Sequence, residues 1–109
     1  MKSEEDYIKQ ADSIVSNHCG RYSNIYSSCG VLLSGGIDSS VITTYVLDHF
    51  KSVHIFSMGT DLTVDRPYVD LLTTHLGMSY EWVELKDSDI TEAMSTVTDL
   101  LLQNGVDKI

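Results

Sequence analysis

The residues of this chain with the clearest chemical potential form one short run, Ser34-Gly35-Gly36-Ile37-Asp38-Ser39-Ser40. Two adjacent glycines let a backbone turn tightly and approach a ligand without a Cβ in the way. The serine hydroxyls can donate hydrogen bonds to phosphate oxygens, and a helix beginning here would add free N–H groups and the positive end of its dipole. Asp38 would repel phosphate unless it binds a bridging magnesium ion. The run therefore predicts a site for a polyphosphate with Mg²⁺.

Three better-known loops do not fit this run. A Walker A loop needs a lysine after its second glycine, and no lysine occurs between Lys9 and Lys51. A dinucleotide fingerprint needs three spaced glycines, and a nucleophile elbow needs glycine two positions before the serine, where this chain has leucine. The remaining alternative is a ligand-free turn in which Asp38 or Ser39 caps a helix. We favour ligand binding because the run follows an apolar strand, where open α/β sheets bind their ligands.

The elements around the run alternate between strand and helix. A helix is expected over residues 4–18, with Ser3 and Asp6 as a capping box and Gly20 as its stop. Strands are expected at 30–33, 53–58 and 80–85, and helices at 39–50, 65–76 and 89–103. This order predicts an α/β fold: a partial doubly wound parallel sheet of three strands alternating with helices, plus an N-terminal helix. The first two strands are nearly all apolar, which is typical of a sheet covered on both faces.

Residues at the ends and faces of these helices have simple structural interpretations. Asp65, followed by Pro67, is expected as the N-cap of one helix, which stops at Gly77. Asp89 is expected as the N-cap of the last helix. The core is expected to include Trp82 on the third strand and an apolar stripe on the last helix, namely Met94, Val97 and Leu101.

Composition limits the class of protein. The 109 residues fit a single small domain, and 42% hydrophobic residues with one proline are typical of a packed globular chain. A formal net charge of −9 disfavours nucleic acid as a partner. No apolar run reaches the ~18 residues that cross a bilayer, and the first residues do not resemble a signal peptide, so we expect a cytoplasmic protein without membrane contact. Cys19 and Cys29 are expected to be buried free thiols.

Residues 34–40 resemble the pyrophosphate-binding loop (PP-loop) of the N-type ATP pyrophosphatases, and their surroundings resemble the asparagine synthetases within that superfamily. The similarity includes residues 30–36, the strand end Phe56-Ser57-Met58-Gly59, and the helix from Asp65 to His75-Leu76-Gly77. It extends over about residues 28–109. The resemblance implies an adenine nucleotide alpha hydrolase-like fold and ATP and Mg²⁺ as cofactors.

The same resemblance implies roles for single residues. Asp38 would bind magnesium, and Leu32 and Met58 would line the adenine and ribose pocket. The pyrophosphate would be held by Ser34, Gly35, Gly36, Ser39 and Ser40. Asp65 is either a further ligand or only an N-cap. The segment with Thr60, Asp61 and Thr63 would either cover the nucleotide or serve as a polar loop.

Asparagine synthetases adenylate a carboxylate, such as that of aspartate, release pyrophosphate and transfer nitrogen to the activated acid. Lys2 stands where glutamine-dependent members carry a nucleophilic cysteine, and the family's second segment, Ser-Gly-Glu-x-x-Asp, is not found in the 109 residues. We therefore interpret residues 1–109 as one PP-loop ATP-binding domain, the N-terminal half of a synthetase-like domain, with no catalytic residue assigned. Turnover would require a glutaminase or a C-terminal half in trans.

The alternative is a non-catalytic adenine-nucleotide-binding module, either a regulatory homodimer or a subunit of a split enzyme. Sulfur transfer to tRNA, a third activity in the superfamily, is disfavoured by the acidic charge and the lack of paired cysteines.

Overall fold

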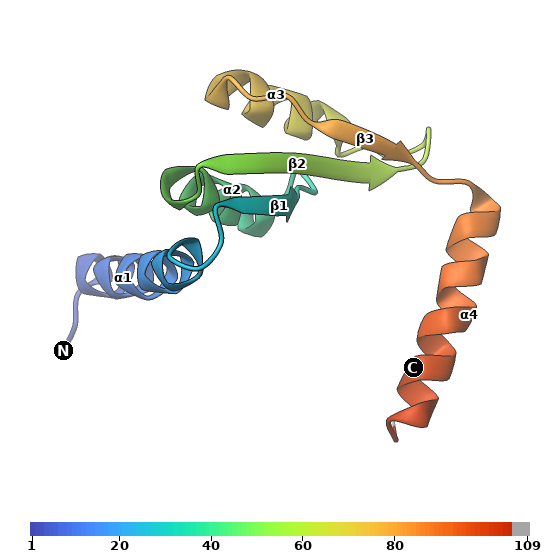
Figure 1. The fold of residues 1–109 in the computed structure, drawn as a ribbon, viewed down its shortest axis with the longest axis horizontal. Coiled ribbons are helices and arrows are strands. Elements are labelled where there is room, and N and C mark those ends of the chain that lie inside the picture. The colour runs from blue at the N-terminus through green and yellow to red at the C-terminus, as the bar shows by residue number, and fades with distance from the viewer. Residues whose placement is uncertain (106–109) are drawn as a thin grey trace.

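The computed structural model describes residues 1–105, and a parallel sheet of three strands in the order β1-β2-β3 lies at its centre (Figure 1). The elements along the chain are α1 Glu4–Ser23, β1 Ser28–Leu32, α2 Ile37–His49, β2 Ser52–Gly59, α3 Arg66–Leu76, β3 Glu81–Glu84 and α4 Asp87–Gln103. This alternation confirms the predicted α/β class and the N-terminal helix. Within the described part of the chain, no helix is long and apolar enough to cross a membrane.

Helices cover one face of the sheet. Val31 pairs with Ile55 across β1 and β2, both are buried, and Ile55 shares a core cluster with Leu33 and with Val69 of α3. Side chains alternate along a strand, so the sequence neighbours of these residues lie on the other face of the sheet. That face is largely exposed near the carboxyl ends of the strands. The expectation of a sheet covered on both faces is therefore wrong for residues 1–105. Two right-handed crossovers in the same direction place α2 and α3 on the same side.

Helix α1 begins as expected and ends later than expected. The amide of Asp6 donates to Ser3 Oγ at 3.3 Å, and Asp6 Oδ2 accepts the Ser3 N–H at 3.0 Å, which confirms the capping box. Gly20 does not stop the helix, which continues to Ser23. The reason is a tertiary contact: α1 packs against α2, where a Cβ on Gly20 would lie 3.6 Å from the ring of His49. Packing of this kind overrides the weak helix propensity of glycine.

Both ends of α3 lie where the sequence predicted them, whereas the start of α4 does not. Asp65 occupies the N-cap position of α3, and Gly77 ends it in the left-handed conformation with φ 67°, both as predicted. Helix α4 begins earlier than predicted, at Asp87, with Lys86 before it. Asp89 is therefore not the N-cap but the third residue of the helix. Its Oδ2 accepts a hydrogen bond from the Lys86 N–H at 2.9 Å. A carboxylate can satisfy the free amides of a helix start from either position.

Helix α4 leaves the end of β3 and runs away from the sheet, and its C-terminal half stands clear of the other helices (Figure 1). None of its residues is buried. The prediction that Met94 and Val97 are core residues is wrong, because both are exposed, and Leu101 is only half-buried. Trp82 is also half-buried instead of fully enclosed. The apolar stripe on α4 has the helical period, yet no described element packs along its length.

Candidate functional site

The predicted phosphate loop connects β1 to α2 at the carboxyl end of the sheet. Helix α2 begins at Ile37, with Gly36 as its N-cap in an extended conformation. Asp38 and Ser39 thus lie inside the first turn, so neither caps the helix as the ligand-free alternative required. Gly36 has no side chain to bond the first amides of α2, and the structure records no side-chain cap there. These amides are therefore available to an anion, which the helix dipole also favours.

The serine hydroxyls of the loop hold its shape. Ser34 Oγ and Ser39 Oγ lie 2.8 Å apart, and Ser39 Oγ also accepts the N–H of Ser34 at 3.1 Å. Ser34 Oγ accepts the N–H of Gly36 at 3.3 Å, and Ser40 Oγ donates to the carbonyl oxygen of Gly36 at 2.6 Å. The structure thus brings together the serines that the sequence predicted as phosphate ligands. Their hydrogen bonds to one another and to the loop backbone hold the loop in this shape.

Gly35 is required by the protein's own packing. Its φ of +88° lies in the left-handed region that side chains rarely adopt. A Cβ there would lie 2.9 Å from the carbonyl oxygen of Asp65 and 3.3 Å from Cβ of Tyr68. From the sequence we expected a ligand to approach this glycine closely, whereas the structure shows close approach of α3. Tyr68, which the sequence did not indicate, is therefore a neighbour of the loop.

Leu32 and Met58 lie on the open face of the sheet. Leu32 pairs with Phe56, so Met58 is two residues further along the neighbouring strand and points to the same side. Their side chains are 69% and 48% exposed, respectively. Both are thus apolar groups accessible at the carboxyl end of the strands, as contact with a nucleoside would require. Their assignment to an adenine and ribose pocket stays a prediction.

The segment after β2 forms a compact turn. The N–H of Thr60 donates to Thr63 Oγ1 at 2.8 Å, and the N–H of Thr63 returns to the carbonyl oxygen of Thr60 at 3.1 Å. Gly59 lies directly against this turn, because a Cβ there would overlap the side chain of Thr63. The two threonines therefore stabilise the turn, which favours the polar-loop interpretation. Asp61 is exposed.

Asp65 is the N-cap of α3 by position, but its side chain makes no capping hydrogen bond. Its carbonyl oxygen accepts the N–H of Tyr68 at 3.0 Å and that of Val69 at 3.3 Å. The carboxylate is exposed. The backbone of Asp65 therefore begins α3, whereas its side chain has no role that the structure assigns.

A charged and aromatic cluster beside the turn was not anticipated from the sequence. The guanidinium carbon of Arg66 lies 4.2 Å from the centre of the Trp82 ring, and Arg66 Nε donates to the hydroxyl oxygen of Tyr80 at 3.2 Å. The Tyr80 hydroxyl in turn donates to Asp70 Oδ1 at 2.5 Å, and Trp82 Nε1 donates to Glu84 Oε2 at 2.6 Å. The pKa of Arg66 is raised, mainly by its hydrogen bond to Tyr80. No local signal predicts this cluster, because it depends on α3 and β3 being neighbours.

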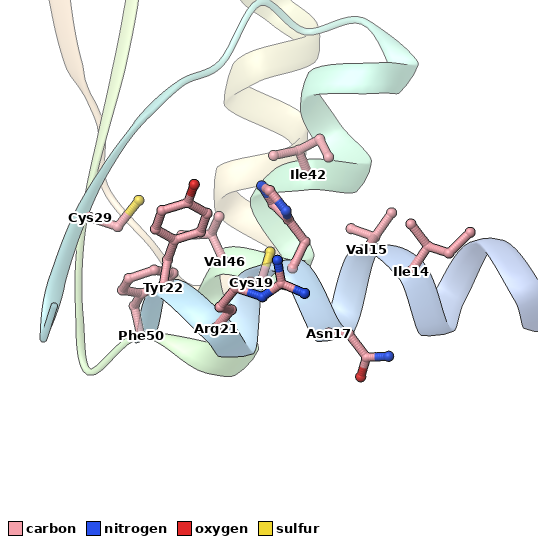
Figure 2. Close-up of a pocket in the computed structure, with 11 residues that line it drawn as sticks. Ile14, Val15, Asn17, Cys19, Arg21, Tyr22, Cys29, Ile42, Val46 and Phe50 are labelled. Carbon is pink, nitrogen blue, oxygen red and sulfur yellow. The ribbon is translucent and has the colours of Figure 1, made fainter. Parts of the chain in front are cut away.

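A separate groove of about 720 Å³ lies between α1, β1 and α2 (Figure 2). Its apolar lining includes Ile42, Val46 and Phe50, and both cysteines contribute to it. Cys19 and Cys29 are free, as predicted, but only Cys19 is buried and Cys29 is half-buried. Burial raises the pKa of the Cys19 thiol, with a further contribution from Cys29. No residue of the phosphate loop lines this groove.

The family model for asparagine synthase matches residues 27–108. The matched region includes the whole sheet and the loop between β1 and α2, together with α3 and α4. A search of curated proteins found no matching sequence.

Proposed function

This chain belongs to the asparagine synthase family, a family of ATP-dependent ligases, and from that membership we propose that residues 34–40 bind the phosphates of ATP together with Mg²⁺. One observation carries the proposal. An uncapped helix begins directly behind an ordered serine–glycine loop, in a chain of a family that uses ATP. Hydroxyl and amide groups of this kind are the usual phosphate ligands at a helix start.

Different groups of the loop would bind the phosphates and the Mg²⁺ ion. Ser34 and Ser39, whose hydroxyls are already adjacent, would turn one or both O–H groups to phosphate oxygens. The first amides of α2 would add N–H donors. Asp38, exposed in that first turn, would hold Mg²⁺, which typically takes one or two carboxylates and completes its shell with phosphate oxygens and water. The donor set therefore fits the group it would hold.

The adenine and ribose would lie on the open face, against Leu32 and Met58. In the reaction that we propose, ATP supplies the adenylyl group: a carboxylate oxygen of an acid such as aspartate attacks the α-phosphorus and pyrophosphate leaves. Nitrogen then displaces AMP from the activated acid. We expect this chemistry in the cytoplasm, where ATP is available.

Adenylation requires positive charge around the transferring phosphate. Arg66 is stacked on Trp82 and bonded to Tyr80, and the loop itself contributes the carboxylate of Asp38. We therefore propose that a C-terminal half acting in trans supplies further catalytic groups. A glutaminase partner would instead supply the ammonia that displaces AMP. The alternative function is nucleotide binding without turnover, in which the ordered loop serves only as a sensor.

Calorimetry of ATP binding with and without Mg²⁺ tests the site. Asp38→Asn keeps the size of the side chain and should weaken Mg–ATP binding at least about tenfold, the lower end of the losses caused by substitutions around a metal site. It should not weaken metal-free ATP binding, which should become tighter because a carboxylate that repels phosphate is removed. Asp61→Asn, in the exposed turn after β2, is the matched control and should behave like the wild type. Equal Mg–ATP affinities for all three proteins would refute the role of Asp38. Pyrophosphate release with aspartate and ammonia, with and without a candidate partner, separates the ligase from the sensor.

A further inference from the structure

A second apolar cleft lies between the end of β2 and α4. It encloses about 430 Å³, which is within the range of small-molecule sites, about 300–1,000 Å³. Met58 and Leu85 line it from the sheet side, and Ile90, Ala93, Met94 and Val97 line it from α4. Asp89 and Thr98 are the polar residues of its lining.

This cleft shares the side chain of Met58 with the proposed nucleotide site. Met58 belongs to both, and it shares the open face of the sheet with Leu32, which precedes the phosphate loop by two residues. The cleft therefore lies at the carboxyl end of the parallel strands, on the side where a nucleoside attached to the loop-bound phosphates would extend. Apolar clefts beside polar anchor groups are typical of small-molecule sites.

The start of α4 is fixed beside Met58. Only two residues separate β3 from α4, and the N–H of Leu85 donates to the carbonyl oxygen of Gly59 at 2.7 Å. The Lys86–Asp89 hydrogen bond then holds the first turn. Ile90, Met94 and Val97 follow at spacings of four and three residues, so they share one face of the helix, and the cleft shows that this face is turned toward Met58.

We propose that α4 forms the second wall of the base pocket, with Ile90 and Met94 contacting the purine on the side opposite Met58. This inference rests on the proposed ATP site and assigns to α4 the recognition of the base. The occupant fits the chemistry of the walls, because a flat aromatic ring suits aliphatic side chains and makes favourable contacts with thioether sulfur. It also explains why an apolar stripe remains exposed on α4: the ligand, and not another helix, covers its first half.

The test compares two ligands that share the phosphates and differ in the base. Binding of Mg–ATP and of Mg–tripolyphosphate is measured by calorimetry on the full chain. Met94→Ala and Ile90→Ala should each weaken Mg–ATP binding about three- to tenfold, the loss expected for one apolar or sulfur–aromatic contact. Neither should change the affinity for tripolyphosphate, which also shows that each variant is folded. Leu100→Ala is the matched control, since Leu100 is a 52% exposed residue of the same helix outside the cleft.

Each outcome is decisive. If Met94→Ala and Ile90→Ala bind Mg–ATP as tightly as the wild type, α4 is not a wall of the base pocket, and the proposed ATP site stands. If the affinities for both ligands fall equally in these variants, the substitutions disturb the fold and do not remove a contact with the base. The inference is then also overturned. If the wild-type chain binds neither ligand, the proposed function itself fails, and the inference fails with it.

Discussion

The backbones of Gly35 and Asp65 are in close contact: a Cβ on Gly35 would lie 2.9 Å from the carbonyl oxygen of Asp65. Because Asp65 is the N-cap of α3, the predicted phosphate loop rests directly on the start of the next helix. Gly35 also has a φ of +88°, so two independent constraints exclude a side chain there. The position of α3 and the shape of the loop are therefore coupled.

Substitution of Gly35 should destabilise the protein more than substitution of its neighbour. Gly35→Ala must adopt an unfavourable φ and displace α3, and strain of this kind costs about 1–3 kcal/mol. Gly36→Ala is the control, because Gly36 has a φ of −79° and a Cβ there would meet only Ser34 Oγ at 3.4 Å. Its cost should stay below about 1 kcal/mol, the usual scale for an N-cap change. Urea unfolding measures both, and equal losses would contradict the coupling.

The order of the elements could be predicted from the sequence because its signals are local. Apolar runs mark β1 and β2, and Gly77 ends α3 in the left-handed conformation that glycine favours. The loop of residues 34–40 could be placed for the same reason, since it is defined by residue types in one run between a strand and a helix.

What could not be predicted depends on contacts between elements. Gly20 looks like a helix stop until α1 is placed against His49 of α2. Trp82 was expected in the core because tryptophan is large and apolar, yet its ring is shared between the sheet and the guanidinium of Arg66, sixteen residues away. The face of the sheet to which Leu32 and Met58 point was likewise not expected to be open. In each case a distant segment determines the environment of the residue.

The stacking of Arg66 on Trp82 gives a direct optical test, since Trp82 is the only tryptophan in the chain. Arg66→Met removes the charge and keeps an apolar stem over the ring. We expect a changed emission intensity of Trp82 and only a small loss of unfolding free energy, because the cation–π contact is exposed to solvent. Arg21→Met, on α1, is the control and should leave the emission unchanged. Identical spectra for wild type and Arg66→Met would show that the stacking does not persist in solution.

The contact between α1 and α2 should depend on pH at the alkaline end. The Tyr45 hydroxyl donates to Asp12 Oδ1 at 2.5 Å, and this hydrogen bond is the main reason that the pKa of Tyr45 is raised. The pKa of Tyr45 is higher in the folded than in the unfolded protein, so the hydrogen bond stabilises the fold fully below pH ~10, the ordinary tyrosine pKa. This stabilisation is lost as the pH rises through the folded-state pKa, because the hydroxyl then loses its proton. Wild type should therefore exceed Tyr45→Phe in unfolding free energy at pH 7, and the difference should shrink toward pH 11. Tyr7→Phe, at an exposed site on α1, should show no such trend.

The two cysteines should differ in reactivity although both are free. Cys19 is 8% exposed, and burial raises the pKa of its thiol, whereas Cys29 is only half-buried. Because the thiolate is the nucleophile and needs access to the reagent, iodoacetamide at pH 8 should alkylate Cys29 well before Cys19, as read by mass spectrometry of peptides. In denaturant the two rates should converge, since the difference comes from the fold and not from the local sequence. If Cys19 reacts as fast as Cys29 in the native protein, α1 packs against α2 more loosely than the structure shows and the Cys19 thiol is not buried.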